Sequence, residues 1–368
     1  MKIAYIITKL SNSGGIERVL STKVNYLADV LEYEIHIIVA GKAEKPFFPF
    51  SGRIYFHFPD MDTRNHSRRE YQQKLFQKLE EVRPDITISM FGLEAEFLYK
   101  AKDGSKKLLE FHYSKNYLTH LINGIHSLKC RPLYKIKAWF IQMKKAYFAS
   151  KYDKIVLLTQ KDLNLWGCKS NMCFIHNPLS FRCEEKSNLE LKRIIAVGRL
   201  IAQKGFDLLI DAFQLIAPDF PDWEIAIFGE GQDKQFLNNK IRQAKLEKQI
   251  TIYPPSSNIK EKMLQSSLFV LPSRYEGFGL VLTEAMECGL PCIAYDCECG
   301  PSEIISNNEN GILVPTGNII QLSDAMRTLM INPSLLKKMG NESKVKVSGF
   351  YVDNVMQQWQ KLFIELTK

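Results

Sequence analysis

Short apolar runs alternate with amphipathic helical segments along the first half of the chain. Ile3–Ile7 is a β-branched run, Glu17–Val30 carries apolar residues at helical spacing, and Glu34–Ala40 is a second apolar run. Three more apolar runs follow charged helical stretches, at Asp85–Met90, Lys107–Phe111 and Lys154–Leu158. Because strands that alternate with helices pair in parallel, this pattern predicts a parallel sheet covered by helices.

Polar segments at His176–Ser180 and Cys183–Leu191 interrupt the alternation, and we place a linker there. A second series follows, with strands predicted at Arg193–Val197, Trp223–Phe228, Ile250–Tyr253, Leu268–Pro272, Cys292–Tyr295 and Gly311–Val314. Its helices are predicted at Gly205–Ile216, Lys234–Ala244, Ile259–Leu264, Leu280–Glu287, Ile320–Ile331, Ser334–Lys338 and Val352–Thr367.

Together these elements predict an α/β fold of two doubly wound, Rossmann-like domains that face each other across a cleft. We place the N-terminal domain at residues 1–178, the C-terminal domain at 179–350 and a final helix at 351–368, which can return to the N-terminal domain. Ligands of such sheets bind at the carboxyl ends of the strands. We therefore expect the chemistry in the loops that follow the strands.

The composition is that of a globular protein, since 45% of the 368 residues are apolar and 24% are charged. This excludes a disordered chain, a collagen-like repeat and a disulfide scaffold. No apolar run reaches the roughly 18 residues of a membrane-spanning helix. The apolar start of the chain is too short for a secretory signal, so a cytoplasmic protein is expected.

The basic excess lies entirely in the first half of the chain. Residues 1–180 hold 28 Lys and Arg against 17 Asp and Glu, and the rest of the chain holds 21 against 23. Within 111–161, ten Lys and Arg accompany a single acid, Asp153. Such a stretch attracts lipid headgroups, nucleic acid or a phosphorylated substrate. No nucleic-acid-binding module is recognisable, so nucleic acid is not an expected partner.

Two patterns raise the question of a metal site. Four of the eight cysteines crowd together at Cys288, Cys292, Cys297 and Cys299, without paired C-x-x-C arms, which favours small buried residues over zinc ligands. The Asp-x-Asp sequence Asp60-Met61-Asp62 lies in a polar loop far along the chain from the phosphate motifs described next. We therefore expect no metal.

The strongest local motif is Ser273–Gly279, between a predicted strand and a predicted helix. Gly277 and Gly279, on either side of Phe278, remove side chains where the backbone enters the helix. Their N–H groups and the helix N-terminus can hold a phosphate. Glu276 before the helix and Glu284 inside it suit the hydroxyl groups of a nucleotide-sugar, because a carboxylate only accepts hydrogen bonds. The alternative is two ordinary surface acids.

Weaker signals lie in other loops that follow strands. Arg199 and Lys204 form a cation pair suited to diphosphate oxygens, or are solvated loop cations. Gly229 and Gly231 after a strand make a second candidate phosphate-side turn. The pair Gly14-Gly15 after the first strand can admit a ligand close to the backbone, or is a simple turn.

In their order along nearly the whole chain, these pieces resemble glycosyltransferase family 4, the retaining nucleotide-sugar-dependent enzymes of GT-B fold. The motifs that carry the resemblance are Gly14–Arg18, Val197-Gly198-Arg199 with Lys204-Gly205, Gly229-Glu230-Gly231, Glu276 with Glu284, and Asn310–Pro315.

The resemblance implies that Arg199 and Lys204 bind the donor diphosphate. It further implies that Glu276 contacts the donor sugar and that Glu284 contacts the ribose. A histidine after an N-domain strand lies near the transferred sugar in the family, and His112 is the candidate here, with a packed loop histidine as the alternative.

The segment Cys299–Ile305 resembles a branch of the family that builds bacterial surface polysaccharides such as capsule or lipopolysaccharide. That branch implies a UDP-linked hexose or N-acetylhexosamine as donor, and a glycan or an undecaprenyl-diphosphate-linked acceptor. No cofactor other than the donor substrate is implied. The chain departs from the family at Tyr253–Ser256, where Pro254-Pro255 replaces a frequent glycine, so base contacts do not carry over.

The segment Lys129–Lys154 interleaves cations with aromatic residues. A basic, aromatic helix can lie on an anionic membrane surface. This predicts a peripheral protein at the inner face of the plasma membrane, close to a lipid-linked acceptor. The alternative is an amphipathic helix whose aromatic residues pack into the N-terminal domain.

Two rival functions remain open. A dinucleotide-dependent oxidoreductase would carry G-x-G-x-x-G directly after the first strand, and Thr8–Gly15 lacks it. A non-catalytic nucleotide-sugar-binding protein would keep the same fold, and only turnover distinguishes it from an enzyme.

Overall fold

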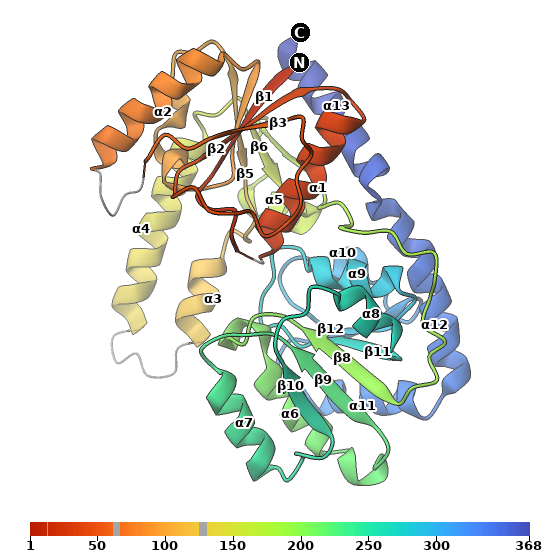
Figure 1. Cartoon of the computed structure of the whole chain (residues 1–368). Coiled ribbons are helices and arrows are strands. Elements are labelled where there is room, and N and C mark those ends of the chain that lie inside the picture. Colours follow the sequence, from red (N-terminus) through yellow and green to blue (C-terminus); the bar gives the residue numbers. More distant parts are fainter. Residues whose placement is uncertain (13, 62–66, 125–130) are drawn as a thin grey trace. The chain divides into compact units, whose positions relative to one another are not determined.

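The chain forms two compact α/β units in the computed structural model, which describes all residues except 13, 62–66 and 125–130 (Figure 1). The first unit contains residues 1–115, 132–180 and 350–368, and the second contains 116–131 and 181–349. Each unit holds one fully parallel sheet with helices on both faces. The predicted fold class is confirmed.

The first unit is built on a seven-stranded sheet in the order β3-β2-β1-β4-β5-β6-β7. Its strands are β1 (Lys2–Ile7), β2 (Glu34–Val39), β3 (Ile54–His57), β4 (Ile86–Ser89), β5 (Lys106–Glu110), β6 (Lys154–Leu157) and β7 (Met172–Phe174). Its helices are α1 (Gly15–Asp29), α2 (Arg68–Val82), α4 (Arg131–Ala149), α5 (Gln160–Trp166) and α13 (Val352–Thr367), with short 3₁₀ turns at Leu93–Glu96 and Leu98–Lys100.

The strands of this sheet are apolar on both faces because helices cover both. In β1, Ile3 and Tyr5 pack against one helical layer, and Ala4 and Ile6 pack against the other. Such continuous apolar runs are typical of buried parallel strands. The C-terminal helix α13 contributes Trp359 to the first layer beside α1, so the final helix does return to the first unit (Figure 1).

The second unit has a six-stranded sheet in the order β10-β9-β8-β11-β12-β13. Its strands are β8 (Arg193–Val197), β9 (Glu224–Phe228), β10 (Ile250–Tyr253), β11 (Leu268–Leu271), β12 (Cys292–Asp296) and β13 (Gly311–Pro315). Its helices are α3 (Tyr117–Gly124), α6 (Phe206–Gln214), α7 (Lys234–Gln243), α8 (Ile259–Leu264), α9 (Leu280–Glu287), α10 (Pro301–Ile304), α11 (Ile319–Met330) and α12 (Pro333–Lys346). Short 3₁₀ turns lie at Ala202–Lys204 (η3), Ala217–Asp219 and Val347–Phe350.

Several elements differ from the sequence prediction, which did not include the short helices α3, α5 and α10. The edge strands β3 and β7 were not predicted, because each is only three or four residues long and partly exposed. Helix α12 continues to Lys346 rather than ending at Lys338, since its later turns bury Met339 and Ser343.

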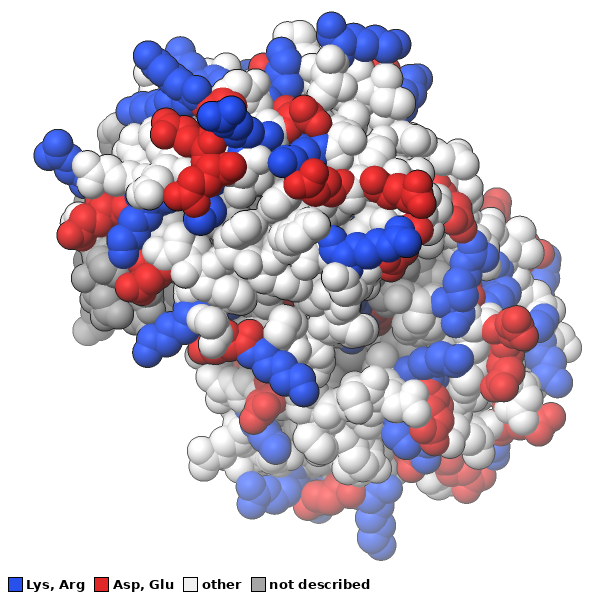
Figure 2. Space-filling model, turned by 45° about the horizontal axis from the view of Figure 1, so that its top comes forward, with Lys and Arg blue, Asp and Glu red and all other residues white. Residues whose placement is uncertain are grey.

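Charges of both signs are interspersed over the face shown in Figure 2. The basic excess of the first half therefore does not form a uniform basic coat on that face. No helix in the described part of the chain is long and apolar enough to cross a bilayer.

Candidate functional site

The centre of the second sheet is where its strand order reverses. Strand β8 lies between β9 and β11, so the chain leaves β8 toward one edge of the sheet and returns to fill the other from β11. A ligand can reach the carboxyl ends of the strands at such a switch point. The loops that follow β8 and β11 carry Arg199, Lys204 and Glu276, and the fold brings Lys204 to Glu276. Arg199 is exposed, and its guanidinium lies 3.4 Å from the side-chain oxygen of Gln203.

Lys204 and Glu276 form an ion pair at this switch point. The Lys204 Nζ atom lies 2.6 Å from Glu276 Oε1, and the Ser273 hydroxyl donates a 2.6 Å hydrogen bond to the same oxygen. Glu276 is only 7% exposed. A Cβ atom at Gly198 would lie 3.2 Å from the Lys204 side chain, so the glycine gives this lysine room.

The two loops are locked to each other by contacts that the sequence prediction missed. The Arg274 guanidinium binds both carboxylate oxygens of Asp207, at 2.8 and 2.6 Å, and donates to the Ala202 carbonyl. The Asp207 carboxylate raises the pKa of Arg274. The Gln203 side chain donates a 3.0 Å hydrogen bond to the Tyr275 carbonyl. Arg274 lies inside the quoted motif, but nothing in the sequence assigned Asp207 as its partner.

The glycines of the second unit allow loops to pack on one another. Gly205 adopts φ +65°, and a Cβ atom there would lie 1.9 Å from the Pro272 carbonyl oxygen. A Cβ at Gly229 would lie 1.9 Å from the Gly198 carbonyl oxygen. Gly231 meets the Leu200 backbone in the same way. These glycines therefore allow the loops to pack closely. Binding of a phosphate by Gly229 and Gly231 stays a prediction.

The remaining predicted residues of this unit lie on or next to α9. Gly279 is the N-cap with φ +96°, Phe278 is buried, and Gly277 is half-buried. Glu284, in the second turn, is 1% exposed. Since neither glutamate is a surface side chain, the alternative of two ordinary surface acids does not hold.

Helix α3 also belongs to the second unit and lies beside the candidate site. The His120 ring stacks on Tyr275, with ring centroids 5.4 Å apart, and its Nε2 lies 3.0 Å from a Glu298 oxygen. Asn116 donates a 2.8 Å hydrogen bond to the other Glu298 oxygen. The sequence prediction did not single out these residues.

The predicted residues of the first unit lie at the carboxyl side of its own sheet. Gly14 is the N-cap of α1 and Gly15 is its exposed first residue, directly after β1. His112 follows β5 and is buried. Burial, and to a smaller extent the charge of Lys23, lower the pKa of His112 to about 4, against the opposing effect of Glu110. The imidazole is therefore neutral at neutral pH.

The clustered cysteines are buried free thiols, and burial raises the thiol pKa of Cys288, Cys292 and Cys297. Across the described ranges, no group of three or more His, Cys, Asp or Glu side chains could hold a metal ion. Asp62 of the Asp-x-Asp sequence lies outside the described residues.

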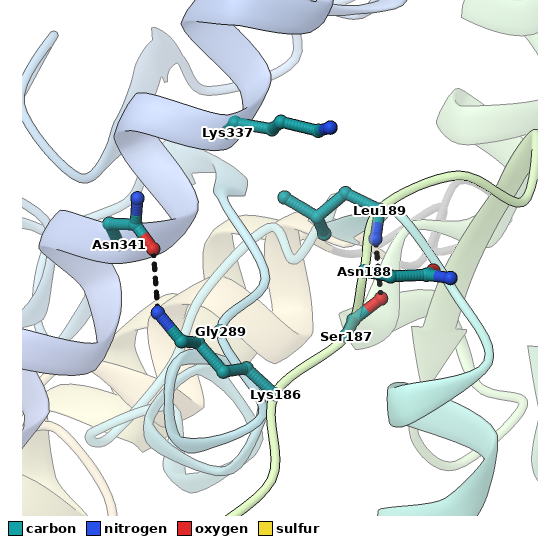
Figure 3. A pocket seen from close by; sticks show the side chains of 7 residues that line it. All are labelled: Lys186, Ser187, Asn188, Leu189, Gly289, Lys337 and Asn341. Carbon is teal, nitrogen blue, oxygen red and sulfur yellow. Dashed lines mark hydrogen bonds between the residues drawn. The ribbon is translucent and has the colours of Figure 1, made fainter.

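A hollow of about 320 Å³ in the second unit lies apart from the predicted site. Its lining comes from the linker, from the turn after α9 and from α12, where Lys186 donates a hydrogen bond to Asn341 (Figure 3). Because Gly289 and Leu189 precede β12 and β8, the hollow faces the amino ends of the strands. None of the predicted residues lines it.

By its fold, the protein belongs to the class of α/β proteins that consist of two doubly wound, Rossmann-like units. Residues 180–346 match the family model of the glycosyl transferases group 1. An uncharacterized glycosyltransferase of Haemophilus influenzae is 30% identical over 98% of this chain and 99% of its own. The chain belongs to this glycosyltransferase family, which confirms the resemblance found in the sequence.

Two further relatives match over nearly full length. The amylovoran biosynthesis glycosyltransferase AmsD of Erwinia amylovora is 26% identical over 98% of this chain and 99% of its own. A Campylobacter jejuni enzyme, named as an α-1,4-N-acetyl-D-galactosaminyltransferase acting on a diNAcBac-PP-undecaprenol-linked glycan, is 24% identical over 100% of this chain and 99% of its own.

Solved structures share the whole fold. Sucrose-phosphate synthase from Thermosynechococcus elongatus superposes with a TM-score of 0.81 at 17% identity, covering 99% of this chain and 98% of its own. The pneumococcal O-GlcNAc transferase GtfA, solved with UDP and GlcNAc, gives 0.78 at 15% identity, covering 100% and 99%. At these identities the likeness shows the GT-B fold alone.

The contact between Gly205 and Pro272 generates a stability prediction. Gly205→Ala should lower the free energy of unfolding by about 3 kcal/mol or more, because a left-handed conformation and a backbone clash both oppose the methyl group. Gly317→Ala is the matched control, since Gly317 has φ +80° but open space around it. It should cost only about 1–2 kcal/mol. Chemical denaturation measures both, and equal losses would contradict the role of the contact.

Proposed function

We propose that the protein is a retaining glycosyltransferase that moves a hexose or N-acetylhexosamine from a UDP-sugar to a glycan or undecaprenyl-diphosphate-linked acceptor in cell-surface polysaccharide biosynthesis. The observation that carries this proposal is the buried contact of Lys204, Glu276 and Ser273 at the switch point of the second sheet. The names of the Erwinia and Campylobacter relatives support a polysaccharide or a lipid-linked glycan as the acceptor.

Cleavage of the anomeric bond leaves negative charge on the diphosphate of the donor. Arg199 and Lys204 are the cations at the site, and the N-terminus of α9 begins within the same loop as Glu276. Positive groups fixed in advance stabilise a charge that develops during the reaction. In this proposal no metal takes part, and the departing phosphate accepts the proton of the acceptor hydroxyl on the same face of the sugar.

Glu276 has two partners that hold its carboxylate in place. Lys204 and Ser273 both bind Oε1, which leaves Oε2 to accept a hydrogen bond from a hydroxyl group of the donor sugar. Glu284 then serves the ribose. In the first unit, Gly14 and Gly15 serve donor binding, and His112 serves the transferred sugar.

The oxidoreductase alternative has no support from the loop between β1 and α1, which lacks the dinucleotide fingerprint. A binding protein without activity would hold the same donor. Turnover of a UDP-sugar separates it from the enzyme.

Helix α4 supports the proposal of a membrane partner through its exposed face. Five large apolar residues at alternating spacings of three and four are each more than half exposed: Leu133, Ile136, Phe140, Met143 and Tyr147. At 100° per residue these positions form one stripe opposite the packed face that contains Ala138 and Ala149. Since most of the aromatic side chains of α4 are exposed, they do not pack into the first unit as the alternative required.

Lys137 and Trp139 flank this stripe on α4, and Lys135 lies farther round the helix. Lys135 and Lys137 are exposed, as is Trp139. Lys145 lies instead against the Phe91 ring, at 4.8 Å, and burial lowers its pKa to about 8. Lys129 lies outside the described residues. The proposed membrane surface is therefore the apolar stripe together with Lys135 and Lys137, and it would bring the enzyme to a lipid-linked acceptor at the inner face of the plasma membrane.

Lys204→Ala should lower turnover by about two orders of magnitude at saturating donor, because one charge-stabilising donor is lost. Lys192→Ala is the control, since Lys192 is an exposed lysine that precedes β8 and pairs only with surface Asp222 among the contacts described. It should retain normal turnover. Steady-state kinetics with a UDP-sugar measures both variants. Near-normal turnover of the Lys204 variant would contradict the proposed role of Lys204 at the diphosphate.

Substitutions of Glu276 and Glu284 should affect sugar transfer and nucleotide binding differently. Glu276→Gln should harm sugar transfer more than UDP binding, while Glu284→Gln should weaken the binding of UDP itself. Glu287→Gln, on the same helix, removes a carboxylate that pairs with Lys344 at 2.9 Å, so it should reduce stability without changing UDP affinity. Calorimetry with UDP and with the UDP-sugar tests this layout. Equal losses of UDP affinity in the Glu276 and Glu284 variants would contradict it.

Two sets of changes should release the protein from anionic vesicles by different routes. Replacing Lys135 and Lys137 with Gln should weaken binding at physiological salt, because each cation near the surface contributes about 1 kcal/mol within a Debye length of about 8 Å. Replacing Phe140 and Tyr147 with Ser should remove the binding that persists at high salt.

Lys337→Gln with Lys338→Gln is the control for net charge, because both lysines are exposed on α12. This variant should bind vesicles normally. Vesicle co-sedimentation over a salt series gives the readout. The membrane proposal fails if the unaltered protein ignores anionic vesicles even at low salt.

A further inference from the structure

The first unit buries a complete ion pair beneath the candidate histidine. Lys23 on α1 binds both carboxylate oxygens of Glu110, the last residue of β5, at 2.8 and 2.6 Å. Both side chains are 1% exposed. The Lys23 ammonium also lies 3.5 Å from the centre of the Trp359 ring, which α13 supplies. The carboxylate is therefore held in one place by a lysine that is itself covered by an aromatic ring.

The stability of the fold gives little reason for this pair. Burial of two charges carries a large desolvation cost, and well-packed apolar residues often replace a buried ion pair without loss of stability. The neighbours of Lys23 on α1 are apolar core residues, Leu20, Val24 and Leu27. An apolar side chain at position 23 would continue the same packed face.

Glu110 lies directly beside the ring of His112. The His112 Nε2 atom is 3.5 Å from Glu110 Oε1. Nε2 is buried and forms no hydrogen bond within the part of the chain that the structure describes. At 3.5 Å the contact is electrostatic rather than a short hydrogen bond. A lone pair on Nε2 would face a fixed negative charge there, whereas an N–H would be attracted to it.

We propose that Glu110, held by Lys23, is a positioning residue that keeps His112 in the neutral tautomer with hydrogen on Nε2, so that Nδ1 accepts a hydrogen bond from a sugar hydroxyl. This inference rests on the proposed function, which puts His112 near the transferred sugar. The two nitrogens of a neutral imidazole differ in role, and the partner of one determines the role of the other. The low pKa of His112 keeps the ring neutral, as the proposal requires.

The first test measures the tautomer in the unaltered protein. Long-range ¹H–¹⁵N NMR spectra of protein labelled at histidine distinguish hydrogen on Nε2 from hydrogen on Nδ1. The His112 signals are assigned by comparison with His112→Ala. The expected result is hydrogen on Nε2 at pH 7. Hydrogen mainly on Nδ1 would overturn the proposal, and this test needs no substitution of Lys23 or Glu110.

The second test removes both charges together. Lys23→Met with Glu110→Leu leaves no unpaired ion, so the variant should fold with similar thermal stability. Turnover should fall by about 10- to 100-fold, the scale of a small misplacement of a catalytic group. UDP affinity by calorimetry should stay unchanged, and the tautomer signal of His112 should move toward a mixture. Full turnover with an unchanged tautomer would refute the positioning role.

A second buried ion pair on the same strand provides the matched control. Lys107 near the start of β5 pairs with Asp103, and the two side chains are 5% and 1% exposed. Lys107→Met with Asp103→Leu removes a comparable pair at the far end of the strand from His112. Turnover should stay within about twofold, and the His112 tautomer should not change. A loss as large as that of the first double variant would assign the effect to general damage to the strand.

A third comparison uses variants of His112 itself. The side-chain amide of Asn can place an acceptor near the position of Nδ1, whereas that of Gln reaches the position of Nε2. His112→Asn should therefore retain more turnover than His112→Gln, and the reverse order would contradict the assignment of Nδ1. If His112→Ala keeps full turnover, the role of His112 in the proposed function fails, whatever the tautomer.

Discussion

In the second unit, the loops that follow β8 and β11 touch through their backbones, and the placement of the candidate donor-binding side chains depends on that contact. Gly205 leaves no space between its Cα and the Pro272 carbonyl, so η3 and the start of the Ser273 loop are held at a fixed separation. Two hydrogen bonds between Arg274 and Asp207 also join these two loops. Lys204 and Glu276 therefore meet because their backbones are already fixed.

The two units use charge differently. In the second unit, the ion pair of Lys204 and Glu276 lies at the end of the sheet, where its charges can exchange partners with a ligand. In the first unit, Lys23 on α1 and Glu110 at the end of β5 are both buried, and the Trp359 ring lies against the Lys23 ammonium. The charges of such a pair act on the titratable groups around it. His112 is one of these groups, and Tyr5 is another, whose pKa is raised by burial and by the charge of Glu110.

The sequence was sufficient for the two parallel sheets, because their central strands are continuous apolar runs that only a doubly covered sheet buries. It was also sufficient to predict that Lys204 and Glu276 come together, since the loops after β8 and β11 meet at a switch point. It could not distinguish a buried Glu284 from a surface acid, because helical spacing does not say which face is covered. Nor could it pair Arg274 with Asp207, since such a contact depends on how two loops cross.

The placement of α13 has a consequence for how the protein is made. Residues 352–367 come after the whole second unit in the chain, yet Trp359 and Phe363 complete a core layer of the first. While a ribosome is still synthesising the second unit, the apolar face of α1 and the charge of Lys23 lack their cover. The core of the first unit can therefore be completed only after the second unit has been synthesised.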